Sequence, residues 1–420
     1  MKKHRPIKQR GRKPSKALQM KQQDAHLEKE LNKNHNREKR KLQVIQGGKS
    51  PKKMVGKLIW IAAICVVAVA VIIINSAAPT GIVELVKVSM ARSAGGSGYP
   101  VTISGSVPKY MVNQGGRLSV LTDTGLIEFN DSGREVYNRL HGFANPVMKT
   151  SAVRSLIFDR GGIHYRIETS AETVYDGKTE QDIITADICD NGTYAIANED
   201  DNNVCVVTVY NKSNTPFYRY NSSKYYVTDV KLSKDGRKMA VATLTSENAE
   251  FKSTVLIYDL TKESPIAKQE FVGETVVSMN FENENNVTVL TGKRWASISV
   301  SDNKLTEYSF GTDRLLQYYT TENLKTVLCL SSNLSSADVR VVVINAKGKQ
   351  ENQFSFSGNI NSVCMTDDRI YILSSELHTY ALNGEKIQTD ITEVGSLCVA
   401  PINDSAAVLY ASGIVLYSEK

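Results

Sequence analysis

The sequence predicts an all-β domain, a seven- or eight-bladed β-propeller with eight blades favoured, tethered by one N-terminal transmembrane helix. From residue 99 to 420, runs of roughly five to eight apolar or alternating residues are separated by Asp-Gly, Asn-Gly and Ser-Gly turns. No helical period of 3.6 residues is present there, and about 320 residues exceed the size of one ordinary sandwich. The apolar run that predicts the membrane helix precedes this region.

Repeated units point to a propeller. The unit at 360–388 contains four predicted strands, at 360–365, 369–374, 377–382 and 385–388. Four-stranded units of about this length stack around a channel in propellers, because one such sheet cannot bury both of its faces alone. The other seven candidate units begin near Gly116, Val153, Ile184, Val230, Val276, Leu315 and Val394.

The two ends of the predicted domain complement each other. The last unit supplies strands at 396–400, 406–410 and 413–418 and then stops one strand short, whereas 99–104 is a strand without a blade. Pairing them would close the ring and remove an exposed edge. Seven blades stay possible, because the units from 228 to 322 are long and irregular.

Four regions follow from hydropathy and charge: a basic, mostly disordered cytoplasmic tail (1–53), a signal-anchor helix (54–78), a juxtamembrane linker (79–98) and an extracytoplasmic propeller (99–420). The run from 58 to 78 is long enough for a bilayer core of about 30 Å, and no charge occurs between Lys57 and Glu84. Residues 1–57 hold 19 Lys and Arg against four acidic residues, whereas the remainder holds 32 against 40. This asymmetry places the tail in the cytoplasm and the propeller outside the cytoplasmic membrane. An uncleaved anchor is favoured, and cleavage near Ala78 is the alternative.

The segments on either side of the predicted anchor can be interpreted from their composition. Residues 81–91 are expected to form a short amphipathic segment, and 93–98, rich in Gly and Ser, a flexible hinge. The basic clusters of the tail suit anionic lipid headgroups. No aromatic residue precedes Trp60, which argues against a nucleic-acid-binding tail.

Several stretches resemble a known family. They are Gly98-Tyr-Pro100, Leu121-Thr-Asp-Thr-Gly125, Arg154-Ser-Leu-Ile-Phe-Asp-Arg-Gly-Gly-Ile-His-Tyr-Arg166 and Ser233-Lys-Asp-Gly-Arg237. With the basic tail and single span, they resemble an uncharacterised family of clostridial-type single-pass membrane proteins, domain of unknown function 5711. The stretch from Ser233 is also similar to WD40 and quinoprotein-type propellers, where such a turn is structural. The resemblance implies a fold and a cell-envelope location, and no chemistry.

The sequence gives little support for catalysis, cofactors or metals. Beyond the tail the histidines are His141, His164 and His378, each in or beside a strand, and no catalytic motif is present. Asp159, in the turn 159–162, is the one further candidate acid, since such a turn can place a carboxylate near the channel, and a plain hairpin explains the turn equally well. The acidic stretch 198–203 reads as a polar turn rather than a calcium site. The five cysteines after the anchor are odd in number and lie mostly in apolar strands, so they are expected to act as small core residues rather than disulfide partners or zinc ligands; they are Cys189, Cys205, Cys329, Cys364 and Cys398.

Aromatic and basic clusters are the candidate partner-binding surface, because Tyr, Trp and Arg are enriched in contact sites. Packing between blades is the competing explanation for the tyrosines. The candidates are Tyr218, Arg219, Tyr220, Tyr225, Tyr226, Lys293, Arg294, Trp295, Tyr318 and Tyr319.

Three functions remain open. The favoured one is a non-catalytic scaffold at a Gram-positive-type cell envelope, whose propeller binds another envelope protein or a wall polymer. The second is a transmembrane sensor or regulator that uses the propeller as its sensing domain. The third is an envelope enzyme of unknown reaction. Partner, pathway and oligomeric state are left undetermined by the sequence.

Overall fold

The computed structural model describes residues 21, 24–34, 61, 65, 82–247, 249–332 and 338–419. Residues 24–34 are helical and belong to a unit separate from the propeller. Most of the predicted tail and anchor lies outside the described residues, with only Ile61 and Cys65 of the span 54–78 among them. In the part that is described, no helix is both long enough and apolar enough to cross a membrane.

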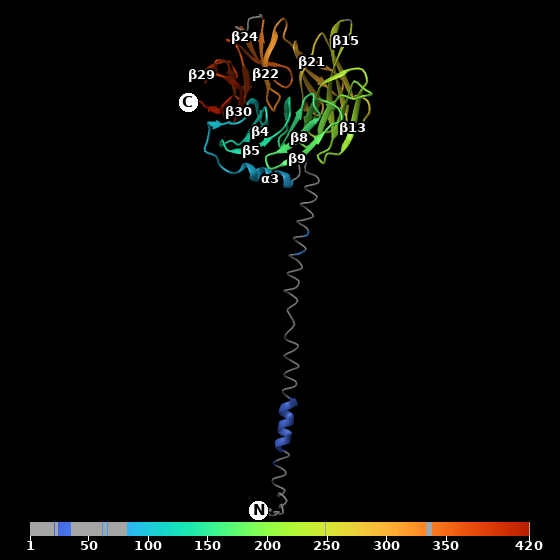
Figure 1. Ribbon diagram of the computed structural model, residues 1–420, viewed down its shortest axis with the longest axis vertical. Helices are drawn as coiled ribbons and strands as arrows, with labels where there is room; N and C mark the ends of the chain where they lie inside the picture. The colour runs from blue at the N-terminus through green and yellow to red at the C-terminus, as the bar shows by residue number, and fades with distance from the viewer. Residues whose placement is uncertain are drawn as a thin grey trace, which may run out of the picture. The chain divides into compact units, whose positions relative to one another are not determined.

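Eight four-stranded antiparallel sheets confirm an eight-bladed propeller, and seven blades are excluded (Figure 1). The strands of blades 1 to 4 are β2 Pro108–Asn113, β3 Leu118–Thr122, β4 Gly125–Phe129, β5 Glu135–Leu140; β6 Pro146–Thr150, β7 Arg154–Asp159, β8 His164–Thr169, β9 Thr173–Lys178; β10 Ile183–Ile188, β11 Tyr194–Asn198, β12 Cys205–Tyr210, β13 Pro216–Ser222; and β14 Tyr226–Leu232, β15 Lys238–Glu247, β16 Glu250–Asp259, β17 Ala267–Val272.

Blades 5 to 8 continue in the same order around the ring. Their strands are β18 Val276–Asn283, β19 Asn286–Thr291, β20 Arg294–Ser299, β21 Leu305–Ser309; β22 Arg314–Thr320, β23 Thr326–Ser331, β24 Asp338–Ile344, β25 Gln350–Ser357; β26 Ser362–Met365, β27 Arg369–Leu373, β28 Glu376–Ala381, β29 Lys386–Ile391; and β30 Ser396–Ile402, β31 Ser405–Tyr410, β32 Gly413–Tyr417, β1 Val101–Thr102.

Ring closure occurs as the sequence predicts. Blade 8 takes its outer strand from the start of the domain, with Val101 opposite Ile414 and Thr102 opposite Gly413. The backbone N–H of Ile103 also donates to the carbonyl of Ser412 (2.9 Å). The first and last parts of the domain are therefore hydrogen-bonded in one sheet, which leaves no open seam.

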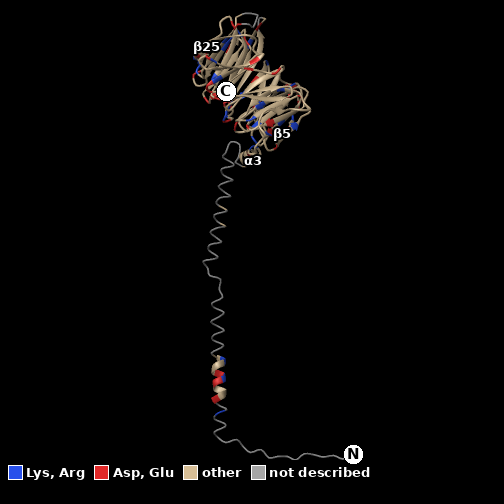
Figure 2. Ribbon diagram, turned by 90° about the vertical axis from the view of Figure 1, so that its left-hand side faces the viewer, with Lys and Arg blue, Asp and Glu red and all other residues tan. Residues whose placement is uncertain are grey.

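The core lies between blades. Second strands such as β3 and β23 are buried at every residue, because neighbouring blades cover both of their faces, whereas an outer strand such as β29 is mostly exposed. The irregularity of the region 228–322 is explained by blade 4, whose β15 and β16 each have 10 residues and extend beyond the inner strand. Acidic and basic residues are interspersed over the propeller (Figure 2).

Within the described residues of the propeller unit there is one helix. α3, Ile82–Arg92, forms where the amphipathic segment was expected, with Glu84 in its first turn and Arg92 in its last, both favourable to the helix dipole. It lies against the part of the propeller that holds β5 (Figures 1 and 2).

Candidate functional site

The two faces of the propeller differ and are named here by their loops. Each blade begins with its inner strand, and all inner strands run the same way through the ring. We call the end at which they finish the helix face; it carries the loops between first and second and between third and fourth strands. The opposite end, with the loops between second and third strands and between blades, is the open face.

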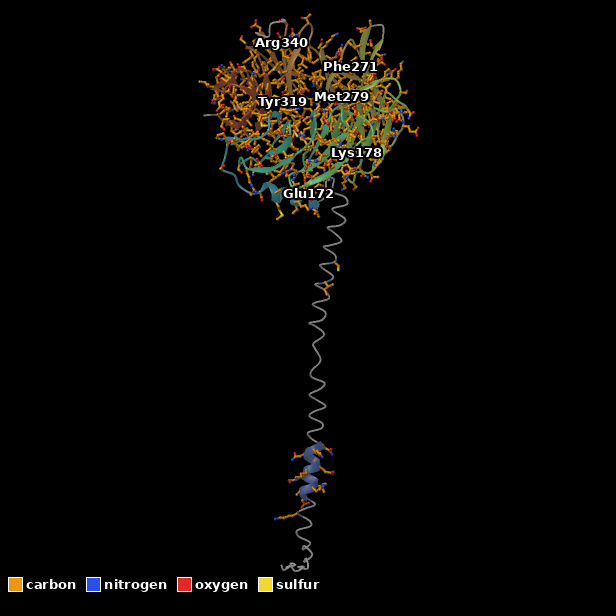
Figure 3. The ribbon with its side chains drawn as sticks, viewed as in Figure 1. Glu172, Lys178, Phe271, Met279, Tyr319 and Arg340 are labelled. Carbon is orange, nitrogen blue, oxygen red and sulfur yellow. The ribbon has the colours of Figure 1, made fainter. Side chains whose placement is uncertain are left out.

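α3 is fastened to the helix face over blades 1 and 2. Its Val88 side chain is buried in the contact. Glu84 and the buried Arg154 form a bidentate ion pair, with Oε1–Nε and Oε2–Nη2 both at 2.8 Å. Lys87 pairs with Glu172 (2.7 Å), and Arg92 donates to the hydroxyl of Ser170 (2.8 Å). Figure 3 labels Glu172 beside the helix.

The linker after α3 is also held, which corrects the expectation of a flexible hinge at 93–98. The side-chain amide of Asn130 donates to the carbonyls of Arg92 (3.2 Å) and Ala94 (2.8 Å). The N–H of Gly96 donates to the hydroxyl of Ser132 (2.9 Å). A Cβ at Gly96 would lie 2.3 Å from the Ser132 carbonyl oxygen, so glycine is needed here for close approach rather than for flexibility.

Beneath this linker lies a buried charged cluster in blade 1. Arg117 and Glu128 pair (Nε–Oε2, 2.8 Å) with almost no exposure. Arg92 reaches it from α3, and burial followed by the repulsion of Arg117 lowers the pKa of Arg92 to about 10. The end of α3 is thus electrostatically coupled to the interior of blade 1.

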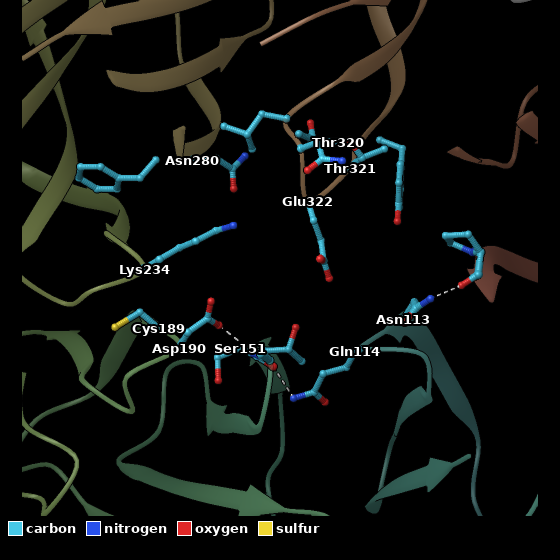
Figure 4. Close-up of a pocket in the computed structure, with 18 of the residues that line it drawn as sticks. Asn113, Gln114, Ser151, Cys189, Asp190, Lys234, Asn280, Thr320, Thr321 and Glu322 are labelled. Atoms are coloured by element: carbon cyan, nitrogen blue, oxygen red, sulfur yellow. Dashed lines mark hydrogen bonds between the residues drawn. The ribbon is translucent and has the colours of Figure 1, made fainter. Parts of the chain in front are cut away.

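The helix face also contains the mouth of the central channel, a cavity of about 550 Å³ lined by the ends of the inner strands. Lys234 of blade 4 and Glu322 of blade 6 extend into it from different sides (Figure 4). Nearby, Asp190 accepts from the N–H of Ala152 (2.9 Å) and Gln114 donates to the carbonyl of Ser151 (2.7 Å). The cavity is therefore polar, and its loops are linked to one another across blades.

Deeper in the channel, opposite charges pair between inner strands. Lys231 of β14 contacts Asp187 of β10 (2.9 Å), and Lys149 of β6 lies 3.6 Å from Asp229 of β14. Burial opposes the charge of Lys231, yet Asp187 raises the pKa of that ammonium. These pairs join blades 2, 3 and 4 at the axis and explain the acidic and basic residues within apolar strands.

The open face is distinguished by exposed apolar side chains. Of eleven large apolar residues of the propeller that are exposed in the described ranges, nine lie at this end of their strands or in its loops. The other two, Phe217 and Ile387, lie near the other end of outer strands. The nine come from blades 4 and 5 and from blades 7, 8 and 1; they are Tyr226, Phe251, Val272, Val277, Ile391, Val394, Leu397, Val107 and Leu140.

The blade 4 and 5 part of this surface has a charged border. Lys293 is exposed in the loop between β19 and β20, and its ammonium and the Glu250 carboxylate both lie beside Gly273. The N–H of Gly273 donates to the carbonyl of Phe251 (2.7 Å), which joins the ends of β16 and β17. Exposed apolar side chains bordered by charges are typical of protein contact surfaces.

The predicted cluster at 218–226 is divided by the structure. Tyr218 and Tyr220 are half-buried against Tyr258, and the hydroxyl of Tyr218 donates to the carbonyl of Lys262 (3.0 Å). Tyr225 is half-buried, whereas Tyr226 is 68% exposed on the open face. The first two tyrosines therefore serve blade packing, and Tyr226 is a surface residue.

Arg219 belongs to a groove of about 790 Å³ between blades 2 and 3. Its guanidinium contacts Asp200 (3.0 Å) in the acidic stretch 198–203, which forms a turn as expected. Asp200 also accepts from the N–H of Asn202 and the amide of Asn203, and these hydrogen bonds, that of Asn203 first, lower its pKa. Among the described residues no cluster of acidic, His or Cys side chains is arranged to hold a metal ion.

Trp295, in the stretch 293–295, was predicted to be a partner-binding residue, and this prediction is wrong. Its side chain is only 2% exposed and packs between blades 5 and 6, where a Cβ at Gly348 would lie 2.6 Å from the ring. Arg294 is half-buried and bound by Glu274 and by Glu307 (2.7 Å), so it too is engaged within the blade. Of the three, only Lys293 is exposed.

Tyr318 and Tyr319 lie on the inner strand β22 and are half-buried. Tyr319 packs against the cores next to blade 7 and lines the channel mouth, and Tyr318 packs in the core between blades 5 and 6. Neither belongs to the open face.

The histidines considered for catalysis are spread over three blades. His141 is buried and stacks on Phe143 (5.0 Å), and His164 is exposed at the start of β8. His378 lies within 3.1 Å of the Ser374 hydroxyl and 3.2 Å of the Thr389 hydroxyl. Asp159 accepts from the N–H of Asn145 (2.7 Å), as a turn residue does.

The five propeller cysteines are free thiols, four of them buried and Cys398 half-buried, which confirms their role as small core residues. Burial raises the pKa of the Cys189 and Cys329 thiols to about 12, so they are protonated at neutral pH.

Comparison with known proteins decides the family. Residues 88–413 match the model of a family of unknown function, DUF5711. The chain belongs to this family. The DUF5711 match begins inside α3 and ends at the first residue of β32, so it includes part of the docked helix as well as the blades. No curated protein matches the chain.

Solved propeller structures are similar to this DUF5711 protein. The C-terminal WD40 domain of Sif2 has a TM-score of 0.56 at 10% identity, over 76% of this chain and 99% of that one. BamB from Moraxella catarrhalis has a TM-score of 0.46 at 11% identity, over 75% of this chain and 99% of that one. At such identity the likeness to the WD40 domain shows the propeller fold alone.

Proposed function

We propose that this protein is a membrane-anchored, extracytoplasmic, non-catalytic scaffold of the bacterial cell envelope that binds another protein through the open face of its propeller. The observation that carries the proposal is the asymmetry between the faces. Of the exposed large apolar side chains that the described blades themselves carry, nine lie on the open face and two, Phe217 and Ile387, lie toward the helix face, where α3 covers blades 1 and 2 and the channel mouth is lined mainly by polar residues.

The exposed apolar side chains of the open face would be stabilised if a partner covered them. Val394 is 104% exposed and Ile391 is 85% exposed, and neither contributes to the core. Each would gain about 25 cal/mol for every Å² of apolar surface removed from water by a partner. Most of the nine residues are aliphatic, which favours a protein surface over a wall polysaccharide, because burying the hydroxyl groups of a sugar against aliphatic side chains without hydrogen bonds is costly.

Membrane anchoring is supported by the sequence. The apolar run 58–78 and the excess of positive charge before it predict a span with the tail inside. Because α3 follows that run and lies on the helix face, the open face would be directed away from the bilayer. Two experiments test the membrane anchoring and the orientation. After an alkaline wash, the full-length protein should pellet with the membranes. When protease is added to intact cells, the propeller should be digested from outside.

Binding is tested by crosslinking the full-length protein in its native membrane and identifying captured proteins by mass spectrometry. Two open-face variants are compared, Tyr226→Ser with Phe251→Ser, and Ile391→Ser with Val394→Ser. The matched control is Phe217→Ser with Ile387→Ser, which removes exposed apolar side chains away from the open face.

Loss of one captured protein in an open-face variant, with retention in the control, is the expected result. Retention in both open-face variants, or equal loss in the control, would overturn the proposed binding face.

One observation favours a second candidate, a transmembrane sensor. The segment after the predicted span is joined to the interior of blade 1 through Arg92 and to blade 2 through the Glu84–Arg154 pair. A change in the propeller would therefore reach α3. Deleting residues 1–50 separates the candidates, since a scaffold keeps its partner and its phenotype without the tail, whereas a sensor loses its output.

A further inference from the structure

We propose that the outer side of α3 lies in the membrane interface, so that the helix face of the propeller rests against the outer leaflet of the bilayer. This inference rests on the proposed membrane anchoring. It names the lipid bilayer as the occupant of a helical surface that the propeller does not cover.

α3 has two different sides. Residues spaced by four, Glu84, Val88 and Arg92, face the propeller, where they form the ion pair, the buried apolar contact and the hydrogen bond described above. Residues 83, 86 and 90 lie on the opposite side of the helix, because their spacings of three and four residues keep them together and away from the docked side. Val86 is 51% and Met90 71% exposed, and Val83 is exposed to the same degree as Val86.

The contacts between α3 and the propeller do not explain why the outer side of the helix is apolar. The ion pairs and Val88 already hold the helix, and the sequence places apolar rather than polar residues where α3 faces away from the protein. A helix on the surface of a water-soluble domain normally carries charged and polar residues there. The outer side of α3 therefore fits an apolar environment that is not the propeller.

The position of α3 in the chain identifies this environment. The predicted span ends at residue 78 and α3 begins at Ile82, and the few residues between can extend about 14 Å at most. The helix must then begin close to the headgroup region. Short helices with one apolar side bury that side about 5 to 10 Å into the boundary between headgroups and acyl chains.

A second copy of the chain is a poorer occupant. The outer side is one short stripe on an 11-residue helix, whereas a stable protein interface buries about 1,200 to 2,000 Å² in total. A bilayer needs no such minimum area, because the span already supplies the attachment.

The interfacial position of α3 would fix the direction in which each face of the propeller points. The channel mouth, with Lys234 and Glu322, would be directed toward the membrane. The open face, with Tyr226 and Val394, would be directed outward, where an envelope partner can reach it.

Quenching of tryptophan fluorescence by brominated lipids tests the proposal. The full-length protein carries Trp60→Phe, which removes the tryptophan of the predicted span; the buried Trp295 remains as a constant background. Met90→Trp is the probe and Val394→Trp, on the open face, is the matched control. Both are reconstituted in vesicles with bromine on the upper acyl chains, and Val86→Trp is the second probe in case the first disturbs folding.

Quenching of about half or more of the added signal at position 90 or 86, with none at 394, is expected. Vesicle flotation separates the two proposals. If the protein floats with the vesicles but neither probe is quenched, the interfacial position of α3 is overturned and the proposed anchor is kept. A probe whose emission is blue-shifted but not quenched would show that a protein covers α3, which also overturns the interfacial position. Protein that does not float overturns the anchoring as well.

Discussion

The helix face and the open face are both formed by the loops that connect the strands of the same eight blades, yet their surfaces are different. On the helix face, α3 and its linker use ion pairs, hydrogen bonds and one buried Val to cover blades 1 and 2, and the channel mouth is polar. On the open face, large apolar residues at the strand ends remain in water. The difference therefore lies in the side chains that the strand ends and loops of each face carry, and the exposed ones on the open face add little to the core.

The largest expected effect comes from breaking the attachment of α3. Glu84→Gln leaves the buried Arg154 without a charge partner, which costs about 3 kcal/mol in similar buried pairs. We expect α3 to detach, with fast hydrogen exchange of its amides. The control is Lys87→Ala, which removes an exposed ion pair with Glu172 and should cost less than about 1 kcal/mol. Similar exchange in both variants would show that the buried pair does not hold the helix.

The linker provides the next test. Gly96→Ala forces a Cβ to within 2.3 Å of the Ser132 carbonyl oxygen, whereas Gly95→Ala meets nothing within 4 Å. Overpacking of this kind costs about 2 kcal/mol, so we expect proteases to cleave 93–98 in the first variant only. Equal resistance in both would mean that the linker is not held by blade 1.

A smaller effect concerns pH at the open face. Burial lowers the pKa of His141, and its Nδ1 accepts the N–H of Phe143 (3.3 Å), which only the unprotonated nitrogen can do. The unfolded chain therefore takes up a proton at higher pH than the folded chain, and the free energy of unfolding falls as the pH drops below about 6.5. His378, whose pKa burial also lowers, acts in the same direction.

Urea unfolding at about pH 7.5 and at about pH 5.5 measures how far the free energy of unfolding falls between the two. The loss of stability between the two should be smaller in His141→Gln than in the unmodified protein. An undiminished loss would assign the pH dependence to other groups.

The smallest expected effect is on stability at the open face itself. Ile391→Ser with Val394→Ser should change the free energy of unfolding by less than about 0.5 kcal/mol, because both side chains are already in water. A loss above about 1 kcal/mol, measured by urea unfolding, would show that these residues support the fold rather than a partner.

Much of the fold could be predicted from the sequence. Repeated units with turns at regular spacing are a property of the chain alone, and the incomplete last unit together with the strand at 99–104 predicted the closure that β1 and β32 form. The signal is strong because each blade repeats it. For residues 81–91 the sequence predicted only a short amphipathic segment, and the structure shows that this segment is the helix α3.

The candidate site was less predictable. Trp295 and Tyr226 are both aromatic residues in strands, but one is packed between blades and the other exposed at a strand end. That outcome depends on which side of a strand faces the next blade and how far the strand extends beyond it. Ile391 and Val394 were missed because an aliphatic residue beside a strand reads as core, and only the neighbouring blades determine its exposure.

The binding face is tested most directly by site-specific photo-crosslinking of the full-length protein in cells of its native organism. A photoreactive residue is placed at Val394 on the open face and, separately, at the exposed Lys262 on the helix face. We expect a discrete protein adduct from position 394 and none from position 262. An adduct formed only from position 262 would contradict the proposed binding face, because the partner would then occupy the helix face, which we propose rests against the membrane.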